Sequence, residues 1–179
     1  HGIILAPNHC RPCDPMVLGI LAGQVRRHLY IMASWHLFMH NRFYAWFLPR
    51  AGVFSVHREG TDRQSMKYAI SLLAEARRPL MIFPEGVLSR HNDRLNNLME
   101  GAAIMARAAA RQRTALSPPG SIVIHPIAIR YVFEGDIEAT VTPVLEAIEA
   151  SMACRPQRDL PLIARVLKVC SAMLALKEI

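Results

Sequence analysis

The chain has 179 residues, of which 52% are hydrophobic and 20% charged, and its formal net charge is +7. This length allows one domain with a substantial core. No apolar run reaches the roughly 18 residues that a membrane-spanning helix needs. Zinc-finger, RNA-recognition and helix-turn-helix signatures are also missing, so we expect no nucleic-acid partner.

The positive charge comes mainly from arginine, because Lys67, Lys168 and Lys177 are the only lysines among 21 basic residues. The planar guanidinium suits contacts with phosphate and carboxylate groups. We therefore expect an anionic substrate or an anionic membrane surface as partner, with a solvated basic surface as the simpler alternative.

Apolar strand-like runs alternate with helical patterns, which predicts an α/β fold. We expect a central, mostly parallel or mixed sheet flanked by helices in a single layered domain. Residues 1–142 would form the α/β part, and residues 143–179 a helical extension of the same domain. The predicted strands are 2–6, 28–33, 51–56, 80–83, 121–131 and 137–142. The predicted helices are 14–24, 35–48, 61–77 and 98–113, followed by helical segments from 143 to 176 with a break near 155–156.

At two positions the scheme predicts the role of a single residue. Asp14 is the expected N-cap of the first helix, with Pro15 at its first position. Pro126 lies inside the longest predicted strand, which indicates a strand at the edge of the sheet or a bulge.

The first candidate site follows the first predicted strand, where His9 precedes Asp14 by five residues. A strand, a tight loop and a helix start would hold the imidazole near the carboxylate. This arrangement suits a general base and the group that orients it. The alternatives are a loop histidine bonded to the backbone and an aspartate that only starts a helix.

Two more motifs follow predicted strands. Phe83, Pro84, Glu85 and Gly86 come after one, and a carboxylate just past a strand end lies where open α/β sheets bind their ligands. The segment from Gly52 to Arg58 ends another. When each motif is considered alone, the alternative is a Pro-Glu-Gly turn for the first and a surface arginine for the second.

Together these residues resemble the glycerophospholipid acyltransferases, a family that includes lysophosphatidic acid and glycerol-3-phosphate acyltransferases. The sequence matches four family blocks in order: Asn8-His9 with Asp14, Gly52-Val53-Phe54 through Arg58, Phe83-Pro84-Glu85-Gly86, and Ile124-His125-Pro126-Ile127-Ala128. The resemblance covers about residues 2–130.

The resemblance implies acyl transfer from acyl-CoA or acyl carrier protein to a hydroxyl of a lysophospholipid or glycerol-phosphate-like acceptor, with no metal or other cofactor. His9 would be the general base, and Asp14 would fix its tautomer. The substrate-binding residues it implies, with neighbouring basic and polar positions, are Asn8, Arg58, Glu85, Gly86, Ser89 and Arg90.

Two positions depart from the family pattern. The third block usually continues Thr-Arg-Ser, but here Leu88 occupies the arginine position and Arg90 follows Ser89. Ser34 stands where a lysine is common. These departures leave the identity of the acceptor open.

An aromatic cluster precedes the second block. Seven of the twelve aromatic residues lie within eighteen consecutive residues, together with Arg42. Tryptophan and tyrosine beside arginine suit a lipid interface, so we expect a peripheral protein on the cytoplasmic side of a membrane. A core helix packed on the sheet is the alternative.

Two other functions compete with acyl transfer. Cys10 and Cys13 form a C-x-x-C pair before a helix, as in thioredoxin-like redox sites or, with a histidine, a zinc site. The four cysteines otherwise fit a reducing compartment. The second competitor is a non-catalytic lipid-binding module that has kept the fold.

Overall fold

The computed structural model describes residues 1–57 and 62–177. The chain divides into two compact units, His1–Arg130 and Tyr131–Ile179. The elements of the first unit, in chain order, are β1 (Gly2–Pro7), α1 (Asp14–Gln24), β2 (Tyr30–Ser34), α2 (Trp35–Met39), α3 (Arg42–Arg50), β3 (Val53–Val56), α4 (Arg63–Glu75), β4 (Leu80–Met81), α5 (Gly101–Thr114) and β5 (Ile122–Ile127).

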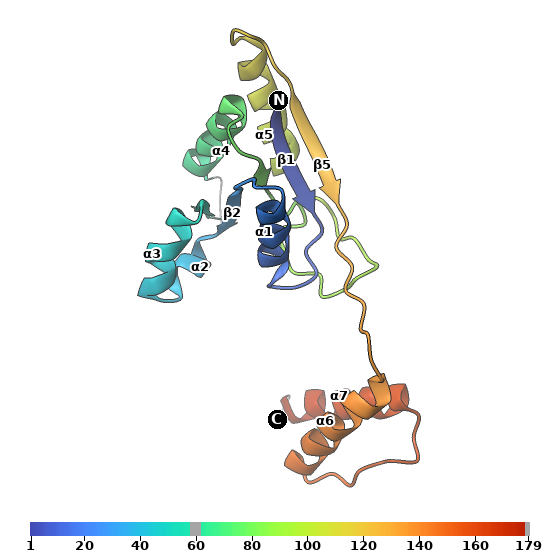
Figure 1. Ribbon diagram of the computed structural model, residues 1–179. Helices are drawn as coiled ribbons and strands as arrows, with labels where there is room; N and C mark the ends of the chain where they lie inside the picture. The colour runs from blue at the N-terminus through green and yellow to red at the C-terminus, as the bar shows by residue number, and fades with distance from the viewer. Residues whose placement is uncertain (58–61, 178–179) are drawn as a thin grey trace. The chain divides into compact units, whose positions relative to one another are not determined.

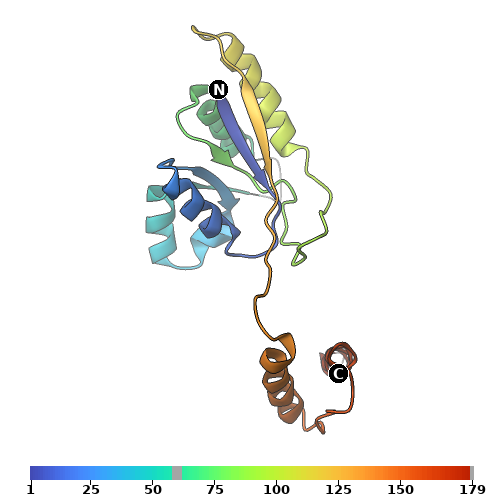
Figure 2. The same cartoon turned by 45° about the vertical axis from the view of Figure 1, so that its right-hand side comes forward.

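The first unit is built on a five-stranded sheet in the order β3-β2-β4-β1-β5, and each neighbouring pair is parallel. Figures 1 and 2 show β1 and β5 side by side, and they pair from Gly2 opposite Ile122 to Pro7 opposite Ile127. The α/β prediction is confirmed, and its sheet is parallel. The carboxyl ends of β1, β2 and β4 therefore meet at one edge.

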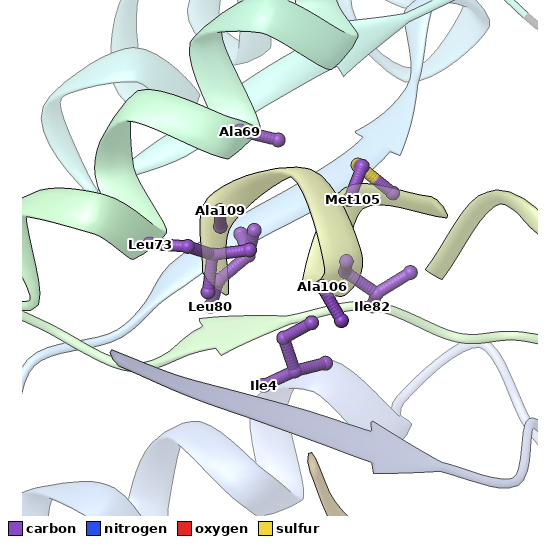
Figure 3. Packing of buried hydrophobic residues seen from close by; sticks show 8 residues of the cluster. All are labelled: Ile4, Ala69, Leu73, Leu80, Ile82, Met105, Ala106 and Ala109. Carbon is purple, nitrogen blue, oxygen red and sulfur yellow. The ribbon is translucent and has the colours of Figure 1, made fainter. Parts of the chain in front are cut away.

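The core of this unit lies between the sheet and helices α4 and α5. Figure 3 shows Ile4 of β1 and Leu80 of β4 directed toward these helices. Leu73 of α4 belongs to the same core cluster. Small residues of α5 let the helix approach the strands closely, and Ala109 is fully buried. This packing fixes β1 and β4, and with them the loops that follow both strands.

Two helix predictions need correction. Asp14 is the first residue of α1 and Cys13 is its N-cap, because the Asp14 side chain turns back to the loop. The single helix predicted at 35–48 is two helices, α2 and α3. Asn41 separates them as the N-cap of α3, where its side chain accepts a hydrogen bond from the Tyr44 N–H at 2.8 Å.

Pro126 lies in β5, an edge strand, as the sequence predicts. The Asn8 N–H donates to the Ile127 carbonyl at 3.2 Å, so Ile127 faces β1. Backbone polar groups alternate in direction along a strand, and Pro126 therefore turns its nitrogen away from β1. The sheet loses no hydrogen bond to this proline.

Asp62 caps the N-terminus of α4. Its carboxylate accepts hydrogen bonds from the Ser65 N–H at 3.0 Å, the His57 N–H at 3.1 Å and the Ser65 hydroxyl at 2.7 Å. These bonds, first among them the one from the Ser65 N–H, lower the pKa of Asp62 from 3.8 to about 2. The cap therefore acts as a carboxylate across the physiological range.

Replacing this cap tests its contribution to stability. We expect Asp62→Ala to lower the free energy of unfolding by about 1 kcal/mol at neutral pH. The pKa of Asp62 is depressed in the folded state, so the carboxylate stabilises the fold above pH 3.8, and that contribution is lost as the pH falls toward about 2. Urea unfolding at neutral and acid pH measures this. A difference that grows on acidification would contradict it.

The second unit contains α6 (Ile137–Ser151) and α7 (Leu162–Lys177). The strand predicted at 137–142 is wrong, because these residues begin α6. Its β-branched residues favour a strand, but Asp136 caps the helix by accepting a hydrogen bond from the Ala139 N–H at 3.0 Å. The expected boundary between residues 142 and 143 falls inside this helix.

A buried ion pair joins α6 to α7. The Arg165 guanidinium donates to both carboxylate oxygens of Glu149, at 2.9 and 2.5 Å. The side-chain hydrogen bonds lower the pKa of Glu149 and raise that of Arg165. The bidentate geometry fixes the register of the two helices. Neither these helices nor any other in the described part of the chain is long and apolar enough to cross a bilayer.

Candidate active site

The predicted pair of His9 and Asp14 is present in the loop that joins β1 to α1. His9 Nδ1 lies 2.9 Å from Asp14 Oδ2, and the same oxygen accepts the Arg11 N–H at 2.9 Å. The Asp14 side chain is fully buried, whereas that of His9 is 14% exposed. A buried carboxylate at Nδ1 places the proton there and leaves Nε2 with a lone pair to accept another.

Phe83 holds the other side of the imidazole. Its ring stacks on that of His9 with centroids 4.0 Å apart and an angle of 28° between the planes. The stacking restricts rotation of the His9 ring, and the carboxylate of Asp14 fixes its edge. The sequence placed Phe83 in the third block but gave no indication of this contact.

Glu85 ties the loop after β4 to the loop after β1. One carboxylate oxygen accepts the His9 N–H at 2.8 Å, and the other accepts the Asn96 N–H at 2.9 Å. The Glu85 side chain is buried, with 4% exposure. Glu85 therefore positions the backbone of His9, a role that the sequence did not suggest. Nothing in the sequence marks Asn96.

Asn8 joins β1 to the end of β5. Its side-chain oxygen accepts the Ile129 N–H at 2.6 Å, and its amide donates to the Ile129 carbonyl at 3.0 Å. This paired contact continues the β1–β5 ladder through a side chain beyond the last strand residues. Asn8 therefore fixes the start of the His9 loop.

The remaining third-block residues shape the neighbouring turn. Gly86 has φ +67°, a backbone conformation that residues with a side chain rarely adopt, and this explains the glycine of the turn. The Ser89 N–H donates to the His9 carbonyl at 2.7 Å, and the Ser89 side chain is buried. Arg90 is exposed and also has a positive φ, of 57°.

The second-block residues are described in part. Gly52 has φ +85°, and a Cβ there would lie 2.7 Å from the Leu29 carbonyl oxygen, which explains the glycine of this block. Arg58 lies outside the described residues. Ser34 ends β2 at the carboxyl edge of the sheet, and Leu88 is 38% exposed.

The two cysteines of this loop differ in exposure, since Cys10 is buried and Cys13 is exposed. Cys10 is 2% exposed, and its sulfur accepts the Asn8 amide at 3.0 Å. Burial, followed by the negative charge of Asp14, raises the pKa of the Cys10 thiol. A raised thiol pKa disfavours the thiolate that redox chemistry requires. Among the described residues, no three His, Cys, Asp or Glu side chains are grouped to hold a metal ion.

Thiol labelling tests this assignment. At neutral pH we expect an alkylating reagent to modify the exposed Cys13 at least about tenfold faster than Cys10, because Cys10 is buried and its pKa is raised. Peptide mass spectrometry of native protein at successive times measures the two rates, and unfolded protein provides the control. Faster labelling of Cys10 would favour the redox alternative.

An apolar cavity of about 380 Å³ lies beside the site. Phe83, Pro84 and Gly86 line one side of it, and Phe83 also stacks on His9. Much of the remaining wall is methionine and aliphatic, from β2, α4, the segment after β4 and α5: Met32, Met66, Ile82, Met99, Ile104 and Met105. Methionine side chains adapt to flexible apolar ligands.

These features define an α/β fold with a paired imidazole and carboxylate at the carboxyl edge of a parallel sheet. The acyltransferase family matches residues 1–130, and the chain belongs to this family. A 1-acyl-sn-glycerol-3-phosphate acyltransferase of Streptococcus pneumoniae (strain ATCC BAA-255 / R6) is 34% identical over 107 residues. This confirms the resemblance to the glycerophospholipid acyltransferases.

The aligned part covers 60% of this chain and 37% of that relative, so the chain corresponds to little more than a third of its length. No solved structure matches the chain. The family match ends at residue 130, where the first compact unit also ends.

Proposed function

We propose that this chain transfers a fatty acyl group from acyl-CoA or acyl carrier protein to a hydroxyl of a lysophospholipid or glycerol-phosphate-like acceptor, with His9 as the general base. The observation that carries the proposal is the 2.9 Å contact between His9 Nδ1 and the buried Asp14 carboxylate, beside an apolar cavity. The family match and the named relative support the same chemistry.

In this mechanism His9 Nε2 removes the proton from the acceptor hydroxyl as its oxygen attacks the thioester carbonyl. The carbon–oxygen bond forms and the carbonyl oxygen becomes an oxyanion. Collapse of this intermediate breaks the carbon–sulfur bond, and the leaving thiolate receives the proton from the imidazolium. Asp14 stabilises the transient imidazolium, and Glu85 keeps the His9 backbone in place.

The apolar cavity would receive the acyl chain of the donor. Phe83 and Gly86 are shared between the cavity wall and the third block, so a chain in the cavity would lie close to the imidazole. In this proposal the reaction uses no cofactor besides the acyl donor. Its lining supports a fatty acyl donor more than a short polar one.

The acceptor would carry its negative charge at the same edge of the sheet. We propose that Arg58, Ser89 and Arg90 bind this charged group of the acceptor. Leu88 and Ser34 replace two basic positions of the family, so the proposal allows an acceptor with less negative charge than a phosphate monoester.

A lipid acceptor also implies where in the cell the enzyme acts. We propose that it acts as a peripheral protein at the cytoplasmic side of a membrane, where lysophospholipids are available. A non-catalytic lipid-binding module is the second candidate, supported by the two changed basic positions.

An acceptor screen tests the proposal. Purified protein and one labelled long-chain acyl-CoA are incubated with lysophosphatidic acid, glycerol 3-phosphate, and zwitterionic or uncharged lipid alcohols. We expect an acylated product with at least one acceptor of the lysophospholipid or glycerol-phosphate class. Binding of these lipids without any product, from acyl-CoA or acyl carrier protein, would favour the lipid-binding module.

A further inference from the structure

We propose that helices α2 and α3 form a docking surface for an anionic lipid bilayer. This aromatic docking surface consists of Met39, Phe43, Trp46 and Phe47, with Arg42 and Arg50 beside them. The inference rests on the proposed function, since it identifies where an enzyme with a lipid acceptor meets the membrane.

The apolar side chains of this surface are exposed. The exposed fraction is 71% for Met39, 62% for Phe43, 55% for Trp46 and 44% for Phe47. Leu48, in the same helix, is buried and 8% exposed. Helix α3 therefore turns Leu48 inward and three aromatic rings outward. The alternative of a core helix packed on the sheet is wrong for these three rings.

The exposed rings form an ordered cluster. The rings of Phe43 and Phe47 stack with centroids 5.5 Å apart and an interplanar angle of 6°, and Phe43 lies 6.3 Å from Trp46. Arg50 places its guanidinium 4.6 Å above the Trp46 ring and donates to the Trp46 carbonyl at 2.7 Å. These contacts assemble the surface before it meets a ligand, which reduces the entropy lost on binding.

The charge around the cluster identifies the occupant. The 44 residues from Pro15 to Arg58 contain five arginines and no aspartate or glutamate. Two of these arginines, Arg42 and Arg50, are exposed on α3 itself. Aromatic rings beside cationic residues are typical of helices that lie in the interface of a bilayer, and positive charge selects anionic lipids.

The position of the surface fits this occupant. Helix α2 begins directly after Ser34, the last residue of β2, at the edge where the loop of His9 also begins. Figure 1 shows α2 and α3 packed together. A bilayer bound here would lie on the side of the molecule from which a lipid acceptor could approach His9.

Vesicle binding tests the proposal. Vesicles of phosphatidylcholine alone and vesicles with about one third phosphatidylglycerol are mixed with the protein, and bound protein is measured by co-sedimentation. We expect binding mainly to the anionic vesicles. Trp46→Ser with Phe47→Ser, or Arg42→Glu with Arg50→Glu, should weaken it at least about tenfold.

The matched control is Val132→Ser with Phe133→Ser, which removes two apolar side chains of similar exposure, 71% and 57%, outside the surface. We expect this variant to bind like the wild type. Circular dichroism confirms that each variant is folded. Equal binding by all variants, or equal loss in the control, would overturn the proposal. So would a change from dimer to monomer in the Trp46 and Phe47 variant, which would identify a second copy as the occupant.

The His9→Ala protein separates this inference from the proposed function. We expect it to bind anionic vesicles like the wild type while its acyl transfer falls by about 10²–10⁴-fold. An active enzyme that ignores vesicles would refute the docking surface alone. A vesicle-binding protein without activity on any acceptor would refute the proposed function alone.

Discussion

The His9→Ala variant should lose acyl transfer by about 10²–10⁴-fold while it remains folded. An alcohol is a poor nucleophile at neutral pH, and His9 Nε2 is the group placed to take its proton. The imidazole is only 14% exposed and bonds to the fully buried Asp14 carboxylate, so its removal should also cost about 1–3 kcal/mol of stability, and rates are compared below the lowered unfolding midpoint. Initial rates with saturating acyl-CoA, with the thermal midpoint as a folding control, measure this effect.

Two further variants sharpen the result. Asp14→Asn preserves the shape of the partner but removes the charge that fixes the His9 tautomer, so we expect a loss in kcat approaching that of His9→Ala. His28→Ala changes an exposed histidine away from the loop and should be as active as the wild type. Undiminished transfer by His9→Ala would remove this residue from the mechanism.

Glu85→Ala should have the second largest effect, on both stability and rate. Its carboxylate accepts the N–H groups of His9 and Asn96, at 2.8 and 2.9 Å. Without it, two donors in a buried site lose their acceptor, at a cost of about 1–3 kcal/mol each. The His9 loop should then shift, and displacements near 1 Å lower rates by about 10²-fold.

The kinetic constants decide what Glu85 does. A fall in kcat with little change in the KM of the acceptor would show that Glu85 positions His9. A rise in KM with kcat unchanged would instead favour the acceptor-binding role that the family resemblance implies. Glu85→Gln is the matched control, because its amide oxygen can still accept one of the two N–H groups, and we expect an intermediate loss.

The sequence predicted the features of the site that depend on neighbouring residues. His9 and Asp14 are separated by one short loop, so their contact follows once a strand and a helix are placed on either side. The order of strands cannot be read in this way. The contact between Glu85 and His9 joins residues 76 positions apart and depends on β4 lying next to β1.

Two of the incorrect predictions arose where two local signals disagreed. In residues 137–142 the β-branched side chains favour a strand, but Asp136 and Glu138 at the helix start favour α6. At residues 40–41 the apolar pattern continues, yet Asn41 is a strong N-cap and begins a new helix. In both cases a capping residue was the better guide than side-chain propensity.

The orientation of Pro126 has a consequence for association. A free edge strand offers a ladder of donors and acceptors to any other extended chain, and this is a common start of aggregation. On the outer side of β5 that ladder is interrupted, because the proline nitrogen facing outward carries no hydrogen to donate. An incoming strand would lose a bond at this position, so the protein discourages growth of its sheet into a neighbouring molecule.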